Sequence, residues 1–152
     1  MDSSPSTVRS RDLLIQTLVD LLTGEGIEIK GARGIEGLEM PPEIANQGFG
    51  SARDKRPDVI GFDHSHRRIV FGLVRENRQS LDSEEALEEY NVFLDHNATL
   101  GERASFVYVM MPQDLVAEFT SIVTHYIHRD YWDRLIAVGS PLTGADPLRQ
   151  RG

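Results

Sequence analysis

Three charged residues near the middle of the chain have types and spacing that could do chemistry: Asp58, Arg75 and Glu76. Asp58 follows Pro57 at the start of a short apolar stretch, and Leu73, Arg75 and Glu76 stand at the end of the next one. Side chains two apart in an extended strand project from one face, so Leu73 and Arg75 should both point toward Asp58. Arg75 stays protonated and cannot act as a base, but a guanidinium can neutralise a carboxylate. We therefore expect Arg75 to pair with Asp58.

The segment 56–76, RPDVIGFDHSHRRIVFGLVRE, resembles the core of the PD-(D/E)xK nuclease superfamily. In that core an aspartate opens one strand, and an acid, any residue and a lysine close the next. Pro57 and Asp58 match, whereas Leu73 stands at the position of the second acid and Arg75 at that of the lysine. Upstream, PPEI at 41–44 is similar to a segment that leads into RPDVIG in some members, with 45–55 as an insertion. The resemblance implies a restriction-endonuclease-like fold with a degenerate site.

The same resemblance sets the expectation for cofactors. Enzymes of the superfamily hold Mg²⁺ on carboxylates and use the lysine to orient or activate a water for attack on a phosphodiester. Leu73 cannot coordinate a metal, and Asp58 alone is a poor Mg²⁺ site. We therefore expect no cofactor and a vestigial site. If the protein is active, it is a Mg²⁺- or Mn²⁺-dependent nuclease in which Glu76, Glu43 or Asp63 substitutes for the missing acid.

The elements that must position these residues follow from the spacing of the apolar side chains. Helices are predicted at 8–23, 82–97 and 114–127, and strands at 27–30, 59–62, 69–74, 106–111 and 135–138. Asp82 and Glu85 have capping-box spacing, and Asp114 is placed to cap the third helix. The polar turn at 63–67 predicts an antiparallel hairpin, whereas crossovers through helices predict parallel pairing later. The result is an α/β fold, αβββαβαβ, with a mixed central sheet flanked by helices, which is also the element order of the nuclease superfamily.

The 152 residues fit one domain, predicted to span 8–139. The serine-rich residues 1–7 are expected to be a disordered lead, and residues 140–152 a loosely ordered tail. Residues 31–55 contain five glycines and Pro41-Pro42 without a sustained period. A loop of that length is expected to hold a hidden short strand or to form a functional flap.

Charge limits the choice of partners. The net charge of −8 argues against strong nonspecific attraction to nucleic acid. Even so, four basic residues flank the two central strands: Arg53, Lys55, Arg56 and Arg78. They could form a local nucleic-acid-binding patch on an otherwise acidic protein. The alternative is an ordinary solvated surface. No apolar run is long enough for a membrane span or a secretory signal, so we expect a cytoplasmic protein without membrane contact.

Other candidate groups have simpler interpretations. His64 and His66 lie on the polar turn, and His125 and His128 are three residues apart, but solvated side chains explain both pairs better than a metal site does. Glutamates 84, 85, 88 and 89 are interpreted as the wet face of the second helix. Trp132, with its neighbouring tyrosines, is either a partner-contact cluster or part of the core.

Three functions remain open from the sequence. The first is a noncatalytic protein with a nuclease-like fold that binds a protein or nucleic-acid partner, favoured by Leu73 and Arg75. The second is a metal-dependent nuclease with a rearranged site, favoured by Asp58 and the nearby arginines. The third is an unrelated α/β interaction domain, because fold alone does not determine function. A homodimer is compatible with all three.

Overall fold

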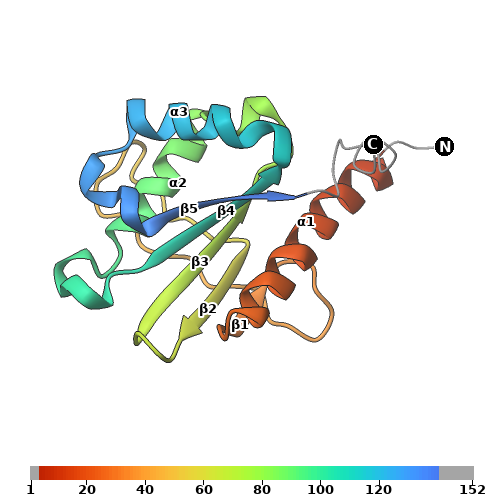
Figure 1. Ribbon diagram of the computed structural model, residues 1–152, viewed down its shortest axis with the longest axis horizontal. Helices are drawn as coiled ribbons and strands as arrows, with labels where there is room; N and C mark the ends of the chain where they lie inside the picture. The colour runs from red at the N-terminus through yellow and green to blue at the C-terminus, as the bar shows by residue number, and fades with distance from the viewer. Residues whose placement is uncertain (1–3, 141–152) are drawn as a thin grey trace.

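Helices cover both faces of a five-stranded sheet in the computed structural model, which describes residues 4–140 (Figure 1). The main elements follow the predicted order: α1 (Ser4–Gly24), β1 (Glu28–Ala32), β2 (Val59–Asp63), β3 (Arg68–Val74), α2 (Glu84–Asp95), β4 (Phe106–Pro112), α3 (Val116–Tyr126) and β5 (Leu135–Ser140). Four short 3₁₀ helices lie between them: η1 (Arg78–Ser80), η2 (Ala98–Arg103), η3 (Gln113–Leu115) and η4 (Arg129–Arg134). Among the helices described, none is long and apolar enough to cross a bilayer.

The strands lie in the sheet in the order of the chain, β1-β2-β3-β4-β5. β2 is antiparallel to both β1 and β3, whereas β3, β4 and β5 are parallel to one another. The predicted hairpin and the predicted mixed sheet are therefore confirmed. Each parallel connection contains a helix, because a crossover must carry the chain back over the sheet before the next strand begins.

The alternation of side chains along β3 divides the interior into two cores. Phe71 and Leu73 pack toward α2 and α3, and Val70 and Val74 pack toward α1. All four side chains are almost fully buried, as expected for a central strand that is covered on both faces. Asp58, just before β2, and Arg75, just after β3, lie at the same end of this strand pair.

Some predicted helix ends are wrong for local reasons. α1 begins at Ser4, before the predicted start at residue 8; Pro5 suits a first turn, where its missing N–H costs nothing. The N-cap of α2 is Ser83, which accepts a hydrogen bond from the Ala86 N–H, whereas Asp82 binds Arg78 instead. Similarly, α3 begins at Val116 and has no side-chain cap. Residues 1–3 and 141–152 of the predicted lead and tail lie outside the described part of the chain.

The long segment between β1 and β2 is folded against the domain. Its only strand-like pairing is a single bridge between Ile44 and Lys55, with N···O distances of 2.6 and 3.0 Å. This bridge takes the place of the hidden strand that the sequence suggested. The bridge closes residues 45–54 into a short loop, which we call the clasp loop.

Candidate functional site

Asp58 lies just before β2, and its side chain is almost completely buried. Its backbone N–H donates to the Gly72 carbonyl, which holds it beside the end of β3. One carboxylate oxygen, Oδ1, lies 2.5 Å from Arg11 Nη2 and 3.0 Å from Arg33 Nε. The other oxygen, Oδ2, accepts a hydrogen bond of 2.9 Å from the Val74 N–H. Two cations and one backbone donor therefore surround this carboxylate.

The two arginines reach Asp58 from distant segments. Arg11 lies on α1, and its second terminal nitrogen is 3.9 Å from Glu76 Oε1, so its guanidinium spans Asp58 and Glu76. Arg33 follows β1 and also donates to the Arg56 carbonyl at 3.2 Å. The substitute acid proposed from the sequence, Glu76, is thus near Asp58, but a cation lies between the two carboxylates.

Arg75 does not pair with Asp58, and that prediction is wrong. Its Nε donates to the Tyr90 hydroxyl at 3.0 Å, and its Nη2 donates to Glu89 Oε1 at 2.7 Å. The guanidinium also lies over the Tyr90 ring, with Cζ 5.0 Å from the ring centroid. Both partners belong to α2, so Arg75 fastens the end of β3 to this helix.

Burial and charge act against each other in this second pair. Burial disfavours the charged form of Arg75, but Tyr90 and Glu89 outweigh that effect and raise the pKa of the guanidinium above its ordinary value. Burial raises the pKa of Glu89, and the negative charge of Asp58 adds to the rise, whereas Arg75 opposes it. The pKa of Glu89 therefore responds to the charges of both Arg75 and Asp58.

The residues at this position do not fit a divalent cation. Leu73 is 1% exposed and belongs to the apolar core. Mg²⁺ requires several oxygen ligands, and the oxygens of Asp58 are already bound by Arg11, Arg33 and a backbone N–H. Within residues 4–140, no group of three histidines or carboxylates is arranged to hold a metal.

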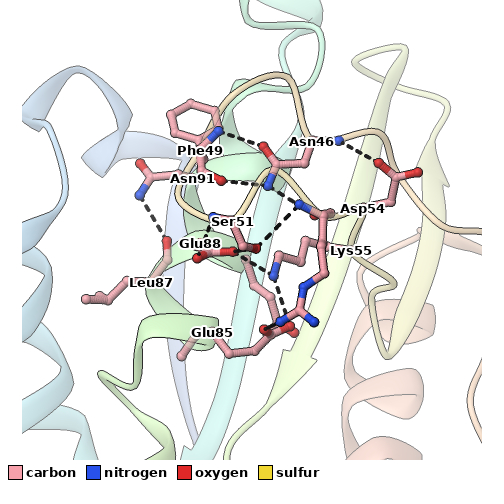
Figure 2. A network of polar contacts seen from close by, with 12 residues as sticks. Asn46, Phe49, Ser51, Asp54, Lys55, Glu85, Leu87, Glu88 and Asn91 are labelled. Atoms are coloured by element: carbon pink, nitrogen blue, oxygen red, sulfur yellow. Dashed lines mark hydrogen bonds and ion pairs between the residues drawn. The ribbon is translucent and has the colours of Figure 1, made fainter.

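The four cations that the sequence suggested as a basic patch lie beside acidic side chains. Lys55 is buried rather than exposed, and its Nζ lies 2.8 Å from Glu88 and 3.0 Å from Glu85 (Figure 2). The other three cations of that prediction also have acidic or carbonyl partners: Arg53 with Glu85, Arg56 with the Pro41 carbonyl and Glu43, and Arg78 with Asp82 and Glu118. Each of the four cations therefore has at least one acidic partner.

The acidic face of α2 holds the clasp loop, a role that was missed from the sequence. Glu88 accepts hydrogen bonds from the Ser51 N–H at 3.0 Å and the Ser51 hydroxyl at 2.8 Å, in addition to its contact with Lys55 (Figure 2). These hydrogen bonds, from Lys55 first and then Ser51, lower the pKa of Glu88 to about 2. Burial disfavours the charged form of Lys55, but its bonds to Glu88 and Glu85 raise its pKa. The available signal was a lone lysine in a glycine-rich loop and two glutamates three residues apart on a helix.

Asn46 organises the tip of the clasp loop. Its amide nitrogen donates to the carbonyls of Phe49 and Arg53, and its amide oxygen accepts from the N–H groups of Gly48 and Phe49. Beside this tip is a cavity of about 470 Å³, bounded by Phe49 on one side and by Asp95 and His96 at the end of α2. Burial lowers the pKa of His96, so its imidazole favours the neutral form.

The two histidines of the turn between β2 and β3 lie outside the site. His64 contacts Glu28 at 2.6 Å, and His66 contacts Asp63 at 2.9 Å, both on the exposed turn between β2 and β3. Burial raises the pKa of Asp63, but the hydrogen bonds from His66 outweigh this effect and lower the pKa below its ordinary value. These contacts agree with the interpretation of the turn as a solvated surface.

No known family matches this chain, and neither a curated protein nor a solved structure matches it. The functional evidence is therefore the geometry itself. It consists of a buried carboxylate neutralised by Arg11 and Arg33, a buried arginine bound to α2, and a loop clasped to the same helix.

Proposed function

We propose that the protein is a noncatalytic binding module built on a restriction-endonuclease-like fold of the PD-(D/E)xK type. The element order supports this proposal, as does the mixed sheet. In the register of β2 and β3, Val59 lies opposite Gly72, which brings Asp58 beside Leu73. The residues that carry the resemblance are therefore neighbours in space.

One observation carries the proposal. Arg11 and Arg33 supply positive charge to Asp58 at the position where the resemblance implies a metal. A buried charge needs a partner of opposite sign. Because the two guanidinium groups are part of the protein, they stabilise the buried carboxylate without a bound metal. The site then contributes to folding instead of catalysis.

A protein partner fits this module better than a nucleic acid does. The net charge is −8, and four of the cations near β2 and β3 are engaged with acids or carbonyls: Arg53, Lys55, Arg56 and Arg78. Nucleic-acid binding depends on cations that are free to neutralise phosphates. The surface described offers few such cations.

The test is a calorimetric titration of Mn²⁺ into the wild type and the Asp58→Ala variant. The expected result is no binding to either protein, with Glu102→Ala as an exposed-acid control. Binding to the wild type that disappears in Asp58→Ala would overturn the noncatalytic assignment. Circular dichroism of each variant establishes that it is folded before it is titrated.

A second candidate is a metal-dependent nuclease with a rearranged site. It is favoured by the closeness of two carboxylates, because the Arg11 guanidinium contacts both: it is 2.5 Å from Asp58 and 3.9 Å from Glu76. In such an enzyme the two carboxylates would hold Mg²⁺ or Mn²⁺ once Arg11 has moved away. Cleavage of plasmid DNA or RNA by the wild type with Mn²⁺, abolished by Glu76→Gln, would establish this candidate. Metal binding that appears only in Arg11→Gln would instead support the noncatalytic assignment of the natural protein.

A further inference from the structure

The two edges of the sheet differ in how they are protected. β1 carries the charged residues Glu28 and Lys30, which are exposed and 3.2 Å apart. Its pairing with β2 is interrupted by a bulge between Ile29 and Gly31. The Ala32 N–H is also bound, by the carbonyl of Glu39 at 2.9 Å. Charges, bulges and covering loops are the usual means by which an edge strand avoids pairing with another chain.

Within residues 4–140, no charged side chain, bulge or covering loop protects β5 at the opposite edge. Its sequence, LIAVGS, contains neither a charged residue nor a proline, and its first five residues are all partly exposed. In the described part of the chain, β5 has β4 as its only neighbouring strand. No backbone hydrogen bond described for residues 136–139 reaches any segment other than β4. Figure 1 shows β5 along the border of the sheet, next to α3.

An apolar groove of about 180 Å³ adjoins this edge. It is bounded by β5, α3 and η4, and no charged residue lines it: Phe119, Thr120, Val123, Thr124, Trp132, Leu135 and Ala137. Trp132 is 40% exposed at its border, and Tyr126 nearby is 54% exposed. An open strand edge beside exposed aromatic side chains has the composition of a protein interface.

We propose that β5 pairs with β5 of a second copy of this chain, antiparallel and about a twofold axis at Ala137. In this register Ala137 faces itself, Ile136 faces Val138, and Leu135 faces Gly139. The two five-stranded sheets then form one continuous ten-stranded sheet. This inference is independent of the state of Asp58 and goes beyond the function proposed above.

The side chains of β5 suit a copy of themselves. An uncharged strand brings no like charges together when it meets itself, although the whole chain carries a charge of −8. The branched pair of Ile136 and Val138 is favourable across antiparallel strands, and Ala137 leaves room for close approach at the axis. Leu135 would lie opposite Gly139. The side chain of Gln113 occupies the space that a Cβ on Gly139 would fill. Twofold dimers are also the commonest symmetric assemblies of soluble proteins.

The absence of cysteine from the sequence permits a direct test by crosslinking. Residues opposite one another in antiparallel strands have Cα atoms about 4.5 to 5.5 Å apart, within the range that a disulfide spans. Mild oxidation of the Ala137→Cys variant is therefore expected to give a disulfide-linked dimer. Lys30→Cys, at the protected edge, is the matched control and is expected to stay predominantly monomeric. Equal crosslinking of the two variants would overturn the proposal.

Sedimentation equilibrium gives an independent readout. The wild type is expected to be a dimer, and Ala137→Lys a monomer with unchanged circular dichroism, because the substitution places two ammonium groups at the axis. Gln47→Lys, which adds the same charge on the clasp loop, should remain a dimer. A monomeric wild type would refute the inference. So would an Ala137→Lys variant that stays dimeric, since the interface would then lie on another face.

Discussion

Arg75 and Glu89 form an ion pair of 2.7 Å between the end of β3 and the middle of α2, where neither side chain has much access to water. The Tyr90 hydroxyl completes the arrangement, since it accepts from Arg75 and donates to the Leu81 carbonyl. The position that resembles the catalytic lysine of a nuclease is thus occupied by a group that joins a strand to a helix.

Arg75→Ala should lower the free energy of unfolding by about 3 kcal/mol, because it leaves Glu89 buried without its partner. Arg75→Met combined with Glu89→Gln should cost less than Arg75→Ala, since no unpaired charge remains. Urea denaturation measures both values, with the exposed Arg103→Ala as control, expected within about 0.5 kcal/mol of the wild type. A double variant at least as unstable as Arg75→Ala would contradict this account.

Asp58→Ala should also destabilise the protein, by about 3 kcal/mol, because it leaves Arg11 and Arg33 without their shared carboxylate. The loss should be smaller in Asp58→Asn, in which the amide oxygen can still accept from the Val74 N–H. Urea denaturation of both variants is compared with that of Asp114→Ala, which alters an exposed carboxylate at the start of η3. An unchanged midpoint for Asp58→Ala would show that the arginines do not depend on it.

Leu73→Glu, which places an acid where the proposed resemblance implies one, should destabilise the fold by several kcal/mol, because Leu73 lies in the core beside Phe71. A buried glutamate has a raised pKa. The Leu73→Glu variant is therefore most stable below about pH 4.3, the pKa of a glutamate in the unfolded chain. Its stability falls as the pH rises through the higher pKa that this glutamate has in the folded protein. The difference in melting temperature from the wild type should grow from acid to neutral pH, but not in Leu73→Gln. Mn²⁺ binding by Leu73→Glu with Arg75→Lys would instead show that the acid reaches Asp58.

The clasp loop should loosen in acid. The pKa of Glu88 is lowered from 4.5 to about 2, so its contribution is fully present above pH 4.5 and is lost as the pH falls toward 2. The NMR signal of the Ser51 amide, which donates to Glu88, should report this transition.

In Glu88→Gln the Ser51 amide should already exchange faster at neutral pH, because the charge that holds Lys55 is missing. Glu84→Gln, in the exposed first turn of α2, should leave the exchange rate unchanged. A Ser51 amide that is equally protected in both variants would show that Glu88 does not hold the loop.

The periodicity of apolar residues was enough to predict the order of the elements and the β2–β3 hairpin. Alternation also correctly placed Leu73 in the core with Phe71. These features depend on residues close together in the chain. The N-termini of α2 and α3 were harder to predict. At α2, Asp82 and Ser83 are both good caps, and Ser83 is the cap because Asp82 binds Arg78.

The charge partners of the site could not be predicted, because they come from distant segments. Asp58 binds Arg11, 47 residues earlier in the chain. Lys55 binds Glu88 on α2, and both β2 and β3 lie between these two residues in the sequence. A local pattern identifies which residues carry charge, but only the packing of α1 and α2 on the sheet decides which charges meet. That is why Arg75 was assigned to the wrong carboxylate.

The spatial order of the strands has a consequence for synthesis on the ribosome. Every strand after the first pairs with the strand that precedes it in the chain, so each can join the sheet as it emerges, without waiting for a later segment. At each stage the outer edge of the newest strand is open until the next strand pairs with it. Among the strands of residues 4–140, β5 emerges last, and no later strand of that range closes its edge.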